Sequence, residues 1–194
     1  QSGLGINFYA LSSYYLGSFF SPLVYFFNVQ SMPDAVYLIT LLKFGAIGLS
    51  AYISLHGIFS KIPRCLVLTL STSFALMSFA ISQIEIKTWL DVFILAPLIL
   101  YGFKKLIYNE GEVLYFISLT SLFIQNYYFG FMMSIFLILW YLTQLSWDIK
   151  GIGKRFFHFV IVSLLSVITS LVMLYPTFLD LRTHGESFSK VDSI

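Results

Sequence analysis

The sequence has few charged residues. Asp, Glu, Lys and Arg make up only 10% of the 194 residues, whereas about 25% is usual in a soluble domain. Hydrophobic residues make up 58%, which is more apolar surface than one core of this size can hide from water. The scarcity of charge therefore argues against a soluble domain. It predicts an all-α, polytopic transmembrane helix bundle, because backbone groups in lipid must hydrogen-bond within helices.

Other absences exclude further classes of protein. Cys65 is the single cysteine, so the chain can form no internal disulfide and no cysteine metal site. The three histidines, His56, His158 and His184, are scattered, and no metal site is predicted. A net charge of +2 without long basic runs predicts no nucleic-acid partner. No phosphate-binding loop, dinucleotide-binding motif or nucleophile elbow occurs. The sequence thus indicates no cofactor, and it leaves a divalent cation open.

Long apolar stretches predict about six spanning helices, since a span takes about 20 residues. The stretches are Asp34–Leu55, Arg64–Ser82, Thr88–Leu106, Val113–Gln125, Phe129–Leu145 and Phe156–Tyr175. A single helix over 113–145 would be roughly 50 Å long, well beyond the ~30 Å hydrocarbon core. We therefore expect a turn at residues 126–130, where Asn and Gly break helices, with a re-entrant hairpin as the alternative.

The positive charges alternate between the connectors of these six stretches. One set of connectors holds seven Lys and Arg, namely Lys61, Arg64, Lys104, Lys105, Lys150, Lys154 and Arg155. The opposite set holds only Lys87, Arg182 and Lys190. Basic residues accumulate on the cytoplasmic side of membranes. The pattern predicts that both ends of the chain lie on the outer side.

The first 33 residues are expected to form an outer interfacial segment. Residues 6–27 carry no charge, but serines interrupt them and Pro22 would break or kink a helix. Their aromatic side chains are typical of the headgroup level. A seventh span is the alternative. The expected organisation is residues 1–33 as this segment, 34–175 as the bundle and 176–194 as an outer loop. Because the chain opens on Gln1, we expect an excerpt of a longer protein.

Asp91 allows a structural and a functional interpretation. Thr88 and Asp91 have the spacing of a capping box, in which the hydroxyl and the carboxylate satisfy N–H groups at a helix start. Ser31 and Asp34 have the same spacing. In the functional interpretation, Asp91 lines an outward cavity. Neighbouring candidates for binding a sugar, a cation or a phosphate are Glu85, Trp89, Asn126 and Asn7. Trp89 is also typical of a membrane-interface anchor, and Asn126 of a cap at the outer turn.

Lys43 lies inside a predicted span. It follows Asp34 by nine residues, so it lies roughly 13 Å below the helix start. An intramembrane charge is costly and marks a functional site by default. Gly45, Ala46, Gly48 and Ser50 form a small-residue surface suited to close helix packing, so Lys43 could meet a carboxylate or a lipid phosphate. In the alternative, the flexible aliphatic chain of Lys43 lets its ammonium group reach the outer lipid headgroups.

Four segments together resemble the bacterial YfhO membrane-protein family. They are GLGINFYALSSYYLGSFFSPLVYFF, MPDAVYLITLLKFGAIGLSAY, KTWLDVFILAPLILYGFKKLI and IQNYYFGFMMSIF, and they come in the family's order. The residues that distinguish these segments from other apolar stretches are Asn7, Pro22, Asp34, Lys43, Asp91 and Asn126. The resemblance runs from about Gly3 to Tyr175.

The resemblance implies a GT-C-like glycosyltransferase of the bacterial plasma membrane. Such an enzyme moves a sugar from a polyprenyl-phosphate carrier to an envelope polymer such as lipoteichoic acid, on the outer face. Its partners would be the donor, the acceptor and membrane lipid. The family's acidic catalytic residue is expected before Gln1, so this excerpt alone should be inactive. The alternatives are a secondary transporter or lipid flippase, and a non-catalytic assembly module of a polymer export complex.

Overall fold

The computed structural model describes residues 18–145 and 152–191, and all of its elements are helices. Two short 3-10 helices, η2 (Ser21–Phe26) and η3 (Val29–Ser31), precede α2 (Met32–Ile58). The remaining helices are α3 (Arg64–Ala75), α4 (Ser78–Ser82), α5 (Lys87–Ile107), α6 (Val113–Gln125), α7 (Tyr127–Leu145) and α8 (Ile152–Val191). The predicted all-α bundle is confirmed.

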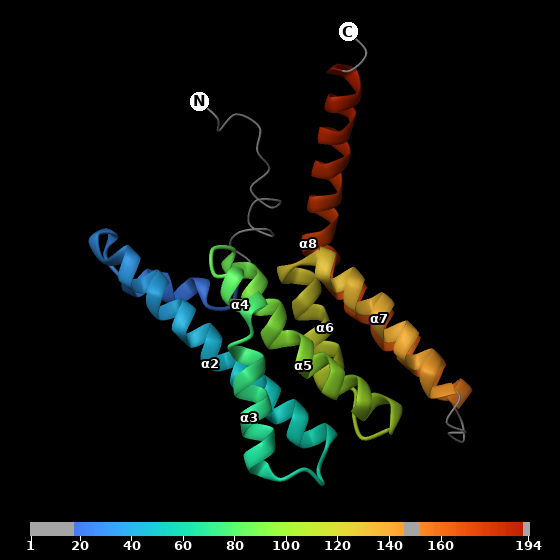
Figure 1. Cartoon of the computed structure of the whole chain (residues 1–194). Helices are drawn as coiled ribbons and strands as arrows, with labels where there is room; N and C mark the ends of the chain where they lie inside the picture. Colours follow the sequence, from blue (N-terminus) through green and yellow to red (C-terminus); the bar gives the residue numbers. More distant parts are fainter. Residues whose placement is uncertain (1–17, 146–151, 192–194) are drawn as a thin grey trace.

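Helices α2, α5 and α7 run downward in Figure 1, whereas α3 with α4, α6 and α8 run upward. The C-terminal ends of α2, α5 and α7 lie at the lower end of the bundle in that view. The starts of α2 and α5 and the junction of α6 with α7 lie at the upper end. Along the described residues, three segments are long and apolar enough to cross a membrane, and they are Val29–Ile58, Arg64–Ser82 and Gly153–Val172. The count of six spans stays a prediction.

Two predicted stretches are interrupted or extended. The stretch Arg64–Ser82 divides into α3 and α4 because Met77 takes an extended conformation, with φ −61° and ψ 144°. The last helix continues through Val191, so residues 176–191 are helical where the sequence predicted a loop. At 1.5 Å per residue its 40 residues measure about 60 Å. The outer position of this end stays a prediction.

The junction between α6 and α7 is a single residue. Asn126 is extended, with φ −153° and ψ 92°, which ends α6 after Gln125. The predicted break in this region is therefore confirmed, and one helix across 113–145 is excluded.

Helix α6 also approaches α5 closely, and this approach depends on Gly102. A Cβ on Gly102 would lie 2.6 Å from the backbone nitrogen of Tyr115.

Two apolar clusters hold the bundle together. The larger joins α5, α6, α7 and α8 and is rich in aromatic rings, including Phe103, Tyr115, Tyr141 and Phe159. The smaller joins α2 to α5 through α3 and α4 and consists of Ile47, Ala75, Ala80 and Leu90. Both clusters use α5, so this helix is central and presents different faces to α2 and to α6.

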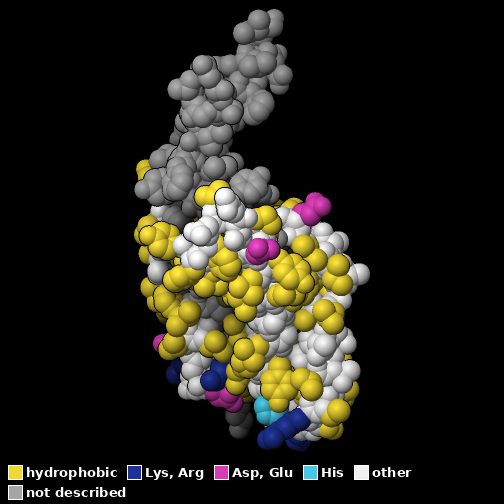
Figure 2. Space-filling view, turned by 90° about the vertical axis from the view of Figure 1, so that its left-hand side faces the viewer, with side chains coloured by type: hydrophobic (Ala, Val, Ile, Leu, Met, Phe, Trp, Pro, Cys, Tyr) yellow, Lys and Arg dark blue, Asp and Glu magenta, His cyan; other side chains and the backbone are white. Residues whose placement is uncertain are grey.

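Basic residues gather at the lower end of the molecule, as Figure 2 shows for one face. Two of them contact the last carbonyl groups of helices there. Lys104 Nζ donates to the carbonyl oxygens of Gly57 (3.2 Å) and Ile58 (2.7 Å), where α2 ends. Arg155 Nη1 donates to the carbonyl oxygen of Ile107 at 2.7 Å, where α5 ends. Cations stabilise helix C-termini, so these residues contribute to the fold as well as to the charge asymmetry.

Candidate functional site

Lys43 lies on the face of α2 that packs against α5. One turn further along, Ile47 is fully buried on the same face. The Lys43 ammonium reaches across to Asp91 of α5, with 2.8 Å between Nζ and Oδ2. The two side chains are only 1% and 3% exposed. Lys43 therefore faces protein, and the alternative in which it reaches the headgroups is wrong.

The ion pair replaces the capping box predicted at Asp91. Helix α5 begins at Lys87, with Ile86 at the N-cap and no side-chain hydrogen bond to the cap. Thr88 is 4% exposed inside the first turn, where its hydroxyl cannot serve as the N-cap. The physical reason is that a buried ammonium without a counter-charge costs several kcal/mol, more than the ~1 kcal/mol that a cap contributes.

The second predicted capping box is also absent. Ser31 is the N-cap residue of α2, but its side chain makes no cap hydrogen bond. Asp34 is exposed in the first turn of the helix. Its negative charge still suits this helix end, which carries a partial positive charge. Asp34 is therefore a surface residue of the helix start, apart from the ion pair.

The segment before α2 covers the ion pair. The Phe20 ring centroid lies 5.8 Å from Lys43 Nζ, within range of a cation–π interaction. Ser18 lies beside the Asp91 carboxylate. Sequence reasoning missed both residues, because nothing in an uncharged, aromatic segment tells which side chain contacts a distant lysine. Asn7 precedes them and lies outside the described residues.

Trp89 and Asn126 meet on the other side of α5. Trp89 packs edge-to-face on Phe129, with 5.3 Å between ring centroids and 80° between planes. Asn126 is 7% exposed, and its Oδ1 accepts a hydrogen bond from the Phe129 N–H at 3.3 Å. Asn126 thus caps α7. These residues line a cavity of about 220 Å³ together with Tyr127 and Tyr128. The structure thus brings the predicted site residues together in two separate sites. Lys43 pairs with Asp91, and Trp89 shares a cavity with Asn126.

Gln125 is a polar residue that sequence reasoning passed over. Its side chain is 2% exposed, and neither Oε1 nor Nε2 has a hydrogen-bond partner in the described part of the chain. The sequence does hold a signal that could have identified Gln125: its amide side chain ends an apolar run, directly before Asn126. Glu85, by contrast, is exposed in the turn between α4 and α5. No three His, Cys, Asp or Glu residues cluster as metal ligands among residues 18–145 and 152–191.

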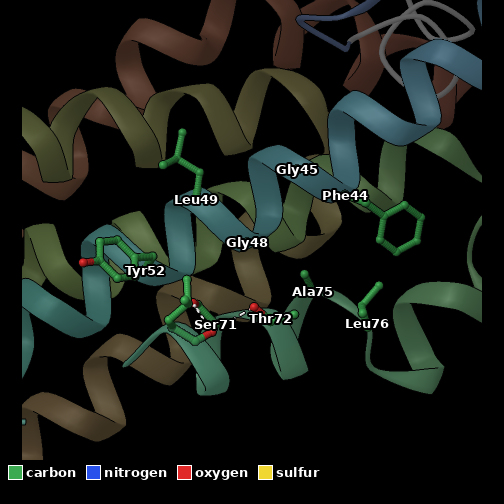
Figure 3. A pocket seen from close by; sticks show the side chains of 10 residues that line it. Phe44, Gly45, Gly48, Leu49, Tyr52, Ser71, Thr72, Ala75 and Leu76 are labelled. Carbon is green, nitrogen blue, oxygen red and sulfur yellow. Dashed lines mark hydrogen bonds between the residues drawn. The ribbon is translucent and has the colours of Figure 1, made fainter. Parts of the chain in front are cut away.

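The small-residue surface of α2 lines a groove. In Figure 3, α2 and α3 flank a hollow of about 530 Å³. A Cβ on Gly48 would lie 3.6 Å from the Ala75 side chain, so α3 comes close at this point. A Cβ on Gly45 would meet nothing within 4 Å. The predicted close packing therefore occurs at Gly48 and not at Gly45.

Ser163 and Ser170 of α8 contact the neighbouring helix α6. Ser163 Oγ and the Tyr115 hydroxyl are 2.8 Å apart and share a hydrogen bond. Ser170 Oγ lies 3.3 Å from the carbonyl oxygen of Thr120, to which it donates. Both contacts connect α8 to α6. These two serines thus make helix–helix contacts, as polar residues in membrane helices often do, and Ser163 also lines a cavity of about 260 Å³.

Comparison with known proteins bears on the whole chain. No curated protein and no solved structure matches it. One family model, described as bacterial membrane protein YfhO, matches residues 1–194. The match includes the covered ion pair of α2 and α5 and the cavity at the start of α7. The chain therefore belongs to the YfhO family of bacterial membrane proteins.

Proposed function

We propose that the full-length protein is a glycosyltransferase that moves a sugar from a polyprenyl-phosphate carrier to an envelope polymer such as lipoteichoic acid. Membership of a bacterial membrane-protein family and the apolar helices place it in a membrane. The observation that carries the finer proposal is the buried pair of Lys43 and Asp91. A charge inside the membrane is costly to keep and marks a functional site.

The chemistry needs a cation where Lys43 lies. In the transfer, an acceptor hydroxyl attacks the anomeric carbon of the sugar. The bond from that carbon to the phosphate oxygen breaks, and the polyprenyl phosphate leaves with the bonding electrons. A base takes the hydroxyl proton, and we place this base outside the described residues. Negative charge grows on the leaving phosphate, and a nearby ammonium in a low-dielectric site stabilises it.

The ion pair keeps the Lys43 ammonium charged and in place before the donor binds. In the closed site, Asp91 neutralises Lys43 and Phe20 covers the ammonium. When the donor binds, its phosphate replaces the carboxylate as the partner of Lys43. Asp91 is then free to accept a hydrogen bond from a sugar hydroxyl. The exchange keeps the ammonium paired at every stage, which avoids the cost of a lone buried charge.

Orientation supports an outer-facing site. Asp91 of the ion pair lies four residues into α5, which begins at Lys87. The start of α5 is at the upper end of Figure 1, and basic residues gather at the opposite end. Basic residues face the cytoplasm in membrane proteins. We therefore place the site on the outer side of the bacterial plasma membrane, where envelope polymers are built.

The test is sugar transfer by the full-length protein in lipid vesicles. Labelled polyprenyl-phosphate sugar and an acceptor polymer are supplied. We expect Lys43→Ala and Asp91→Asn each to lower transfer by about 10²–10³-fold, as the loss of one transition-state donor does. Lys61→Ala, an exposed lysine at the opposite end, is the matched control and should transfer normally. Normal transfer by both site variants would reject the assigned roles. Movement of the donor across the bilayer without transfer would assign a flippase instead.

A further inference from the structure

The small cavity beside Trp89 lies at the outer-facing end of the bundle. Its lining comes from the first turn of α5 and from the junction of α6 with α7, and its volume is about 220 Å³. Trp89 and Asp91 are two residues apart on α5, so they point roughly 200° apart around the helix. Asp91 contacts α2, whereas Trp89 contacts α7. The cavity is therefore distinct from the ion pair.

The aromatic lining of the cavity is held in place. Phe129 packs edge-to-face on Trp89 at 5.3 Å and on Tyr128 at 5.7 Å. The Phe129 backbone N–H donates to Asn126 Oδ1, which fixes the amide between the two helices. Such contacts limit the rotamers of large side chains, so a ligand would find the rings already positioned. These contacts position Trp89, Phe129 and the Asn126 amide, whereas Tyr128 is exposed.

Polar groups accompany these rings. Asn126 lines the cavity with an amide that is 7% exposed. A ligand with several hydroxyl groups can supply both donors and acceptors. None of the five lining residues is Lys or Arg, so the cavity does not suit a phosphate.

We infer that this cavity binds a single sugar ring. A pyranose has apolar C–H faces that pack on aromatic rings and hydroxyl groups that hydrogen-bond to amides. The volume of about 220 Å³ is below the ~300–1,000 Å³ of sites for drug-sized ligands, so it suits one ring. The inference rests on the proposed function, in which both donor and acceptor carry sugars.

Binding is tested with the full-length protein in lipid nanodiscs by saturation-transfer NMR. The probes are the methyl glycosides of glucose, galactose, mannose and N-acetylglucosamine. We expect saturation transfer to the ring protons of at least one of them. Trp89→Ala should weaken that binding at least tenfold, while Trp89→Phe should weaken it less. Trp140→Phe is the matched control, because Trp140 packs on Phe103 in the larger apolar cluster, and it should bind as the wild type does.

Two results would overturn the inference. One is that no probe shows saturation transfer to the wild type, and the other is that Trp89→Ala binds as the wild type does. Failure of the proposed function looks different. If the wild type transfers no sugar in the vesicle assay but Trp89→Ala still loses glycoside binding, the cavity remains a sugar site and the enzyme proposal falls. If transfer is normal and Trp89→Ala leaves KM unchanged, the enzyme proposal stands and the cavity assignment falls.

Discussion

At the scale of single residues, the pair of Lys43 and Asp91 can be both structural and functional, and substitutions can separate the two. Lys43→Met alone leaves a buried carboxylate unpaired, so we expect the free energy of unfolding to fall by about 3–5 kcal/mol. The double variant Lys43→Met with Asp91→Leu removes both charges. Its free energy of unfolding should be near that of the wild type, since apolar replacement of a buried pair is often neutral. Both should be measured by denaturant titration in detergent.

The double variant also tests the function. Because it keeps the fold, we expect it to lose sugar transfer while its thermal stability stays normal. A double variant as unstable as the single one would show that more than charge pairing holds α2 to α5. The same variant with normal transfer would show that the pair is structural only.

The sequence pointed to both members of this pair and left their contact open as one alternative, since Lys43 could meet a carboxylate or a lipid phosphate. The spacing of Thr88 and Asp91 favours a local cap, and only the position of Lys43 within a span indicated a need for a counter-charge. Helix α2 is apolar around much of its circumference: Leu41 and Leu42, beside Lys43, are exposed. Periodicity therefore could not tell which face of the helix is buried. A contact between residues 48 positions apart in the chain depends on packing that no local pattern encodes.

At the scale of helices, the packing of α5 on α6 depends on the absence of a side chain at Gly102. A Cβ there would lie 2.6 Å and 2.7 Å from the N and Cα atoms of Tyr115, and backbone cannot move aside easily. We expect Gly102→Ala to lower the free energy of unfolding by about 1–3 kcal/mol, as overpacking does. Gly45→Ala is the control, since nothing lies within 4 Å of its Cβ position. It should be neutral or slightly stabilising. Equal losses in the two variants would contradict the close approach.

The contact of α8 with α6 gives a second prediction for helices. Tyr115→Phe and Ser163→Ala each remove one side of a 2.8 Å hydrogen bond. A double-mutant cycle should give a coupling energy of about 0.6 kcal/mol and no more than ~1.7 kcal/mol, the range found between membrane helices. The measurement is unfolding in detergent of the wild type, both single variants and the double variant. A coupling energy near zero would mean that the hydroxyl groups do not stabilise the helix pair.

Helix positions were more predictable than helix interruptions. Apolar runs located the helices from α2 to α8, with α3 and α4 as a single stretch, because length and hydropathy are local properties. The break at Met77 involves neither Gly nor Pro, the residues that mark breaks in a sequence. Pro97, which does look like a breaker, lies inside α5. Tertiary contacts of α3 and α4 with their neighbours decide where the backbone bends, and composition does not carry that information.

At the scale of the whole molecule, every functional assignment depends on which end of the bundle faces out. Residue 61 lies between α2 and α3, and residue 86 is the N-cap of α5. These two places are at opposite ends of the bundle in Figure 1. Cysteine labelling in intact cells distinguishes them, in a background where Cys65 and any other cysteine are replaced by Ser. We expect Ile86→Cys to react with a membrane-impermeant maleimide, because basic connectors stay inside. Lys61→Cys should react only after the membrane is permeabilised.

The reverse labelling pattern would show that the site faces the cytoplasm. Lys43 and Asp91 would then lie near the inner headgroups, and a carrier presenting its sugar on the outer face could not reach them. The cavity at Trp89 would face the cytoplasm as well, since it shares the same end of α5. Labelling of both positions in intact cells would instead contradict the alternation itself. The orientation of the bundle is therefore the measurement on which the enzyme proposal and the sugar site both depend.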